Sequence, residues 1–381
     1  MDIYIHISYS TKLNELLIFY NLQNSVWGVN MSYFKSFKKN EKSKIMRNFI
    51  IIVIALVCLF ELIIVYENKL KSEESGINEE LNNIEISSKY VVGISKDNLI
   101  VTGQTSSWGS GIIVSKDGYI VTNSHVCGEK NSECFVIIDY HNCYKGYVVW
   151  SDENLDLAFV KVDKEFSGCI KIGDSDNIKV SQEVFSIGNP INMNFQRSVG
   201  KGIVSGLNRN LKIEEQGKNY YFNNLIQTDA MINYGNSGGA LVDSDGNLIG
   251  ISTVKITDAD LMGFAIPVNV IRPIIRELEE DGRFEEASLK IWCSDKYSLD
   301  DSGNGIRIDD GVFVSQITFD SNSEKSGLRV GDIINYVDTN KVDTVLELKE
   351  YIYSKKVGEN VVLKINRDNK EVFVNIKLEK A

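Results

Sequence analysis

Between residues 89 and 267 the sequence alternates between short runs of β-branched and aromatic residues and turns rich in glycine, aspartate or asparagine. The runs include YVVGIS, GSGIIVS, YIVTNSHV, CFVIIDY, LDLAFVKV, KGIVSGL and GALVDSDGNLIGIST. Many short strands separated by turns favour a barrel or sandwich over a layered α/β fold. We therefore expect a mainly β domain over this part of the chain.

A helix is expected directly after the strand-rich region. Apolar residues recur there at helical spacing, at Ile271, Ile274, Ile275 and Leu278. Asn269 precedes them as a candidate N-cap, and Pro273 falls in the first turn, where proline is tolerated. We expect this helix to close the β domain.

Near the N-terminus, an apolar run covers residues 49–66 and is interrupted only by Glu61. Eighteen residues at about 1.5 Å each span roughly 27 Å, close to the thickness of a bilayer core. Glu61 lies near the outer end, where its charge can reach the interface. A cleaved signal peptide is the alternative, but ENKLKSEESG after the run contains no small-x-small cleavage pattern. The run therefore predicts an uncleaved single-pass anchor in the cell membrane.

Charge around this run predicts its orientation. Basic residues precede it and acidic residues follow it: Lys35, Lys38, Lys39, Lys42, Lys44 and Arg47, then Glu67, Glu73, Glu74, Glu79 and Glu80. Positive charge remains on the cytoplasmic side, so we expect a cytoplasmic N-terminus and extracytoplasmic domains. Nothing in the orientation needs the upstream sequence, and we expect the true start at Met31 or Met46.

The formal net charge of −11 argues against a nucleic-acid partner. Phosphate binding needs a concentrated basic face, and beyond residue 50 the sequence has no basic cluster. We expect no nucleic-acid partner.

A serine lies among three glycines in Gly235-Asn236-Ser237-Gly238-Gly239, just before an apolar run. Glycines allow the positive φ angles of a tight turn and leave room for a substrate backbone. The same turn can aim the amides of Gly235 and Ser237 at one point, as an oxyanion hole requires. Ser237 is therefore a candidate nucleophile, although an ordinary Gly-Ser turn gives the same pattern.

A serine nucleophile needs a base, and the chain contains three histidines. His6 lies on the wrong side of the expected membrane. His125 ends the apolar run YIVTNSHV, whereas His141 lies in a polar stretch typical of an exposed turn. We predict that His125 is the base.

A third group must orient the imidazole and stabilise its protonated form. Asp156 has apolar neighbours on both sides, so its carboxylate should be partly buried and hydrogen-bonded. Asp152 and Asp163 occupy more polar settings, where a solvated surface charge is expected. The predicted triad is His125, Asp156 and Ser237.

The segments TNSHV, LDLAFVKV, GNSGGALVD and GFAIPV, in this order, resemble the motifs of the HtrA/Deg family of serine proteases. The resemblance implies a chymotrypsin-like double six-stranded barrel and a trimeric assembly. It also implies that Ile232 and residues 253–263 shape a pocket for small aliphatic side chains, and that residues 208–223 sense a second domain. Asn236 replaces the aspartate that receives the new N-terminus in chymotrypsin-like zymogens, so activation by that route is not expected.

Residues from about 290 predict an α+β domain: a strand near 310–317, a helix over 345–353 and a hairpin across Asp368-Asn369. This order and the segment GLRVGDII resemble a PDZ domain, which binds a peptide C-terminus as an added strand. The resemblance places the peptide site at Gly305, Ile306 and Ile308. Asn304 departs from the pattern, because the family usually has an aliphatic residue there. A purely structural module is the alternative.

Four of the six cysteines belong to the expected β domain: Cys127, Cys134, Cys143 and Cys169. Cys127 and Cys134 could form a disulfide across one loop, and packed free thiols are the alternative. The spacing of His125, Cys127, Cys134, His141 and Cys143 resembles a zinc-ligand set, but zinc would remove His125 as a base. We expect neither a metal nor another cofactor.

Five parts are expected: a cytoplasmic segment 1–45, an anchor 46–66, a linker 67–85, a serine protease domain 86–282 and a PDZ domain 283–381. The predicted function is a serine endopeptidase that cleaves misfolded or regulatory extracytoplasmic proteins under control of C-terminal peptides. A catalytically silent chaperone or scaffold for unfolded chains is the alternative. Membrane-protein substrates and a homotrimer are the expected partners.

Overall fold

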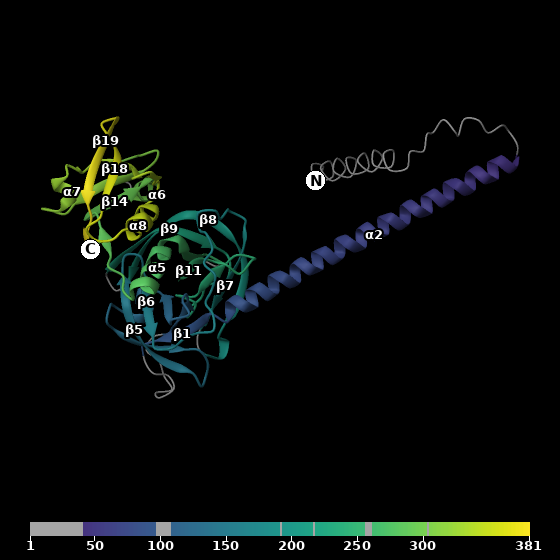
Figure 1. Cartoon of the computed structure of the whole chain (residues 1–381), viewed down its shortest axis with the longest axis horizontal. Helices are drawn as coiled ribbons and strands as arrows, with labels where there is room; N and C mark the ends of the chain where they lie inside the picture. The colour runs from purple at the N-terminus through teal and green to yellow at the C-terminus, as the bar shows by residue number, and fades with distance from the viewer. Residues whose placement is uncertain (1–40, 97–107, 191–192, 216–217, 256–260, 303–304) are drawn as a thin grey trace. The chain divides into compact units, whose positions relative to one another are not determined.

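The computed structural model describes residues 41–381 except 97–107, 191–192, 216–217, 256–260 and 303–304. The chain divides into two units, residues 1–76 and residues 77–381. Figure 1 shows the chain and labels several of the elements described below.

A single long helix, α2 (Glu41–Ser88), begins the described chain (Figure 1). Among the described residues, it is the one helix long and apolar enough to cross a membrane, and its apolar window is not buried in protein. Large side chains such as Phe49 and Phe60 are mostly exposed, as a membrane anchor or a signal sequence requires. The expected linker, 67–85, continues the same helix. Its charged residues are good helix formers, and Leu70, Ile77, Leu81 and Ile84 recur at helical spacing.

Six strands close into the first barrel, in the order β1-β2-β3-β6-β5-β4. They are β1 Val91–Ser95, β2 Gly109–Ile113, β3 Tyr119–Thr122, β4 Glu133–Ile137, β5 Cys143–Asp152 and β6 Leu157–Val162. Their β-branched and aromatic side chains fill the interior, with Phe159 and Ile120 fully buried. A short helix, α4 (Ser124–Cys127), connects β3 to β4.

A second closed barrel follows the order β10-β11-β12-β9-β8-β7. Its strands are β7 Glu183–Gly188, β8 Ser198–Glu215, β9 Lys218–Thr228, β10 Ala240–Val242, β11 Leu248–Lys255 and β12 Gly263–Pro267. A 3₁₀ turn, η2 (Met193–Phe195), precedes β8. The two barrels confirm the predicted chymotrypsin-like fold.

After β12, the 3₁₀ turn η3 (Val268–Ile271) leads into α5 (Arg272–Asp281). Ile274, Ile275 and Leu278 are buried, so the predicted helix is confirmed. The cap prediction is wrong, because Asn269 lies in η3, where its side chain donates to Asp174 Oδ1 at 2.9 Å. The Asn269 Oδ1 atom, which a cap would need as its acceptor, instead accepts from the Ser175 amide at 3.1 Å.

The remaining chain forms a smaller α+β domain around a sheet ordered β14-β15-β16-β18-β19. Its elements are β13 Ala287–Ser288, β14 Ile291–Asp295, α6 Lys296–Ser302, β15 Val312–Ile317, α7 Asn322–Lys325, β16 Ile333–Val337, β17 Asn340–Lys341, α8 Val345–Tyr353, β18 Asn360–Arg367, β19 Lys370–Lys377 and β20 Glu379–Lys380. Strand β14 is at one end of this order, and α8 contacts it.

Local signals explain two elements that match the predictions closely. A capping box joins Thr344 and Glu347 at the start of α8. Asp368 and Asn369 both have positive φ, of 52° and 61°, as a tight hairpin turn between β18 and β19 requires.

Candidate active site

The imidazole of His125 and the carboxylate of Asp156 are in direct contact. Nδ1 of His125 lies 2.8 Å from Oδ1 and 2.9 Å from Oδ2 of Asp156. His125 belongs to α4, and Asp156 ends the turn between β5 and β6, so the first barrel supplies both groups. The His125 side chain is 53% exposed and that of Asp156 is 6% exposed. This geometry fixes the ring while leaving one edge accessible.

Both carboxylate oxygens of Asp156 accept further hydrogen bonds. Its Oδ1 also accepts from the Ser124 hydroxyl at 2.9 Å and the His125 amide at 3.2 Å, and its Oδ2 accepts from the Thr253 hydroxyl at 2.6 Å. Asn123 Nδ2 donates to the backbone carbonyl of Asp156 at 2.8 Å. These donors satisfy the buried carboxylate, as the sequence required. Ser124 and Thr253 were not predicted to take part.

Ser237 occupies the loop between β9 and β10 of the second barrel. The Ser110 amide in the first barrel donates to the Ser237 carbonyl at 2.8 Å, which joins the nucleophile loop to β2. Gly238 has a φ of 82°, and a Cβ there would lie 2.1 Å from the Ser110 carbonyl oxygen. Only glycine fits this position, which explains the second glycine of the motif.

The Ser237 hydroxyl donates to the backbone carbonyl of Thr253 at 2.9 Å. Thr253 therefore contacts both candidate groups, Ser237 through its carbonyl and Asp156 through its hydroxyl. Within the described part of the chain, the amides of Gly235 and Ser237 have no hydrogen-bond acceptor. Both are thus available to an incoming oxyanion.

Asn236, which lies between Gly235 and Ser237 in the sequence, is buried. Its Nδ2 donates to the Met231 carbonyl at 3.1 Å. Its carboxamide also lies so close to Gly188 that a Cβ there would be 2.6 Å from Oδ1. Asn236 thus braces the loop internally through Met231 and packs it against Gly188 at the end of β7.

Ile232 is buried, and Gly263 leaves room for it, because a Cβ at Gly263 would lie 2.8 Å from the Ile232 Cδ1 atom. Part of the expected pocket segment, residues 256–260, lies outside the described residues. His141 is exposed, and its amide donates to Asp139, as expected for a surface turn.

The expected peptide site of the smaller domain lies in a loop. Gly305, with a φ of 78°, and Ile306 and Ile308 lie between α6 and β15. Asn304 lies outside the described residues. Strand β14 instead forms one edge of the sheet in the described chain, and α8 lies beside it. The short sequence IWCSD gave only a weak strand signal, so β14 was not predicted.

Of the two possibilities for Cys127 and Cys134, the structure has packed free thiols and not a disulfide, and both are buried. They pack among apolar side chains of the first barrel. Burial raises the pKa of Cys134 to about 12, and it raises the pKa of Cys127 further. Both are therefore packed as protonated thiols.

Asp152 is also not the solvated surface charge that its polar neighbours suggested, because it is only 8% exposed. Burial alone would raise its pKa, but the Lys349 ammonium and the amides of Leu155 and Asn154 hold the pKa below its ordinary value. The partner that buries it is almost 200 residues away in sequence, so no local pattern could reveal it.

Comparison with known families supports both domains. Residues 109–251 match the family described as "Trypsin-like peptidase domain", and residues 248–378 match the "PDZ domain" family. Proteins named "Serine protease HtrA-like" from Staphylococcus aureus strains MRSA252 and NCTC 8325 are each 35% identical over 286 residues. The match covers 71% of this chain and 37% of each relative, so this chain spans well under half the length of the relatives.

Solved structures give the same architecture. "HtrA-type protease AlgW with decapeptide" is 27% identical, with a TM-score of 0.56 over 79% of this chain and 98% of that chain. The serine endoprotease from Yersinia pestis is also 27% identical, with a TM-score of 0.53 over 80% of this chain and 97% of that chain. A trypsin-like barrel pair joined to one PDZ domain is thus the architecture that this chain shares with HtrA-type serine proteases, to which it is similar.

Proposed function

We propose that this chain is a serine endopeptidase with His125, Asp156 and Ser237 as its catalytic triad. The observation that carries the proposal is the contact of His125 Nδ1 with both carboxylate oxygens of Asp156, at 2.8 and 2.9 Å. This contact fixes the tautomer that leaves Nε2 as the proton acceptor.

In the proposed reaction, the Ser237 hydroxyl turns from the Thr253 carbonyl towards His125. Nε2 takes its proton as Oγ forms a bond to the scissile carbonyl carbon, and the carbonyl electron pair moves to oxygen. The amides of Gly235 and Ser237 stabilise that oxyanion. As the C–N bond breaks, the imidazolium returns the proton to the leaving amine, and water then hydrolyses the acyl-enzyme by the same steps.

We propose that Ile232 lines the pocket for a small aliphatic side chain. The buried, apolar Ile232 side chain beside Gly263 supports this proposal. Misfolded or regulatory extracytoplasmic proteins are the proposed substrates.

The PDZ domain is proposed to bind C-terminal peptides that regulate the protease. The similar structures include "HtrA-type protease AlgW with decapeptide" and "HtrA-type protease AlgW with tripeptide", which supports peptide binding in this architecture. PDZ domains bind a peptide by adding it to a sheet edge. The edge strand β14 beside α8 supports a site there, with Gly305, Ile306 and Ile308 in the loop that follows α6.

We also propose a homotrimer that α2 anchors in the cell membrane, with a cytoplasmic N-terminus. The apolar, exposed part of α2 and the basic residues before it support the anchor. The trimer follows from the family resemblance.

The test is cleavage of casein by the detergent-solubilised chain, together with labelling by a fluorophosphonate that reacts with activated serines. We expect the wild-type chain to cleave and to be labelled, and Ser237→Ala to do neither while its thermal unfolding midpoint stays unchanged. Labelling that persists in Ser237→Ala would place the nucleophile elsewhere. An unlabelled, inactive wild-type chain that still binds unfolded casein would favour the chaperone alternative.

A further inference from the structure

Helix α8 of the PDZ domain is partly buried against the protease domain. Tyr353, 3% exposed, lies in a cluster of aromatic rings with Trp150 of β5 and with Phe284, at centroid distances of 6.2 and 5.5 Å. Leu346 of α8 belongs to the same apolar core as the barrel residues. The face of α8 that carries Leu346 and Tyr353 is thus packed like a protein interior.

The polar ends of this cluster converge on Asp152, the last residue of β5. Oδ2 of Asp152 accepts from the Lys349 ammonium at 2.9 Å and from the Tyr353 hydroxyl at 3.2 Å. Tyr353 also contacts Glu286 Oε1 at 3.1 Å, and Trp150 Nε1 donates to Glu286 Oε2 at 3.2 Å. Because Asp152 is buried, removing one of these partners leaves its charge uncompensated, which costs more than breaking a surface ion pair.

The other oxygen of Asp152 organises the turn that leads to the catalytic aspartate. Oδ1 accepts from the Asn154 amide at 2.8 Å and from the Leu155 amide at 3.2 Å. The Asp156 amide closes the turn on the Glu153 carbonyl at 3.3 Å. Asp156 then has a φ of 53°, a conformation that non-glycine residues adopt only when their surroundings hold them there.

We propose that Lys349 and Tyr353 of the PDZ domain act as positioning residues for catalysis: they hold Asp152, and the Asp152 turn fixes Asp156 against His125. The carboxylate of Asp152 thus connects two elements. Its Oδ2 atom binds α8 of the PDZ domain, and its Oδ1 atom binds the turn that leads to Asp156. The proposal rests on the proposed protease function. It assigns the docked PDZ domain a supporting role, independent of any peptide that the domain binds.

Two variants isolate this link without removing the apolar packing. Tyr353→Phe keeps the ring and removes the hydroxyl. Asp152→Asn keeps Oδ1 for the turn and replaces Oδ2 with an amide that cannot accept from Lys349. In the full chain in detergent, we expect each to lower kcat for a small quenched peptide by about 10-fold, with KM unchanged. The small substrate does not reach the PDZ domain, so the effect has to pass through the turn.

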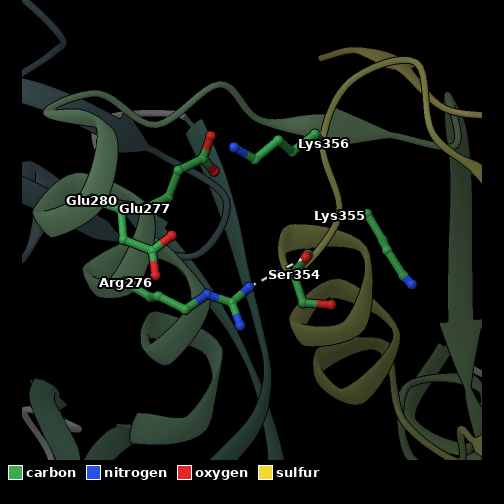
Figure 2. A pocket seen from close by; sticks show the side chains of 6 residues that line it. All are labelled: Arg276, Glu277, Glu280, Ser354, Lys355 and Lys356. Atoms are coloured by element: carbon green, nitrogen blue, oxygen red, sulfur yellow. Dashed lines mark hydrogen bonds between the residues drawn. The ribbon is translucent and has the colours of Figure 1, made fainter.

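A matched control uses a second ion pair across the same domain junction. Lys356 donates to Asp281 at the end of α5 at 2.9 Å, and both groups are exposed. Figure 2 shows Lys356 pointing towards α5, and Arg276 donating to the Ser354 carbonyl at 3.3 Å. Within the described part of the chain, these four residues, Lys356, Asp281, Arg276 and Ser354, form no bond with the catalytic turn. Lys356→Met should therefore leave kcat unchanged.

The second measurement is the low-field NMR resonance of the His125 Nδ1 proton, in chains labelled with ¹⁵N-histidine. The chain has only three histidines, and Asp156→Asn identifies the resonance by removing it. We expect Tyr353→Phe and Asp152→Asn to shift or broaden it and Lys356→Met to leave it unchanged. A general loss of stability would instead lower the unfolding midpoint and leave the folded-state resonance in place.

The proposal would be overturned if both test variants had the kcat and the resonance of the wild-type chain. A higher kcat in the variants would also overturn it, because the docked PDZ domain would then restrain the site. A wild-type chain that hydrolyses nothing would refute the proposed function alone. The resonance would in that case still decide whether Asp152 connects the PDZ domain to Asp156.

Discussion

Thr253 connects two members of the proposed triad that come from different barrels. Its hydroxyl donates to Asp156 and its carbonyl accepts from Ser237, so this one residue of β11 fixes the carboxylate and sets the resting direction of the nucleophile. Sequence reasoning placed Thr253 only at the start of a pocket segment. Its role depends on β11 of the second barrel reaching a turn of the first, 97 residues away.

Replacing Thr253 with valine keeps its shape and removes the donor to Asp156. A buried hydrogen bond to a charged group is worth about 1.5–3 kcal/mol, so we expect kcat to fall by roughly 10- to 100-fold. Thr253→Ser keeps the hydroxyl and should retain most activity. Steady-state kinetics on a quenched peptide measure both. Equal activity in the valine and serine variants would show that the donor has no role.

Gly238 and Gly282 both have positive φ, 82° and 69°, but they differ in their surroundings. A Cβ at Gly238 would meet the Ser110 carbonyl, whereas a Cβ at Gly282 would have no atom within 4 Å. Gly282→Ala should cost only the left-handed strain, about 1–2 kcal/mol. Gly238→Ala adds a backbone clash, so we expect a clearly larger loss in thermal or urea unfolding. Similar losses would mean that the nucleophile loop can shift away from Ser110.

At the scale of elements, sequence patterns predicted what local chemistry determines. Helix α8 begins at a capping box and ends where the pattern ended, and the Asp368-Asn369 turn fixed the last hairpin. The candidate site also followed from local motifs. Strand β14 and the burial of Asp152 did not, because they depend on distant partners. The continuation of α2 through residues 67–88 was missed because the charged, Ser/Asn/Glu-rich composition is typical of a linker, although Leu70, Ile77, Leu81 and Ile84 recur at helical spacing.

Glu350 of α8 lies where the PDZ domain packs against the protease domain, and we expect it to make the stability of the fold depend on pH. It lines a cavity of about 430 Å³ with Asp176, Arg272 and Glu347. Burial, and then the negative charge of Asp176, raise the pKa of Glu350 to about 7, with Arg272 opposing and Asp174 and Glu347 adding to the shift. A carboxyl group with a raised folded-state pKa stabilises the fold below its unfolded pKa of 4.5, and this contribution is lost as the pH rises through 7.

Glu350→Gln should therefore raise the unfolding midpoint at pH 8 by a few degrees and have little effect at pH 5. The measurement is thermal unfolding across this pH range. Glu165, an exposed carboxylate on the first barrel, provides the control, and Glu165→Gln should behave alike at both pH values. A Glu350→Gln effect that is the same at pH 5 and pH 8 would contradict the assignment.

At the scale of the whole molecule, α2 belongs to two units. Its apolar part lies in the first unit, and its last turns lie in the second, which begins at Ile77. In those last turns Ile84 is 5% exposed within the barrel core, and the Ser87 hydroxyl donates to the Gly246 carbonyl at 2.7 Å. The protease fold therefore includes the end of a helix whose beginning is the proposed anchor.

Two fragments test where the folded unit starts. Fragment 77–381 keeps Ile84 and Ser87, whereas fragment 89–381 lacks both, so the shorter fragment should be less stable by about 2–5 kcal/mol, the usual loss for a buried aliphatic side chain. In the full chain, Ile84→Ala should reproduce most of this loss. Ile86→Ala, at a position 41% exposed on the same turn, should cost little. Urea unfolding monitored by tryptophan fluorescence measures all four. If the two fragments unfold at the same urea concentration, the helix end contributes nothing to the protease fold, and the domain begins at β1.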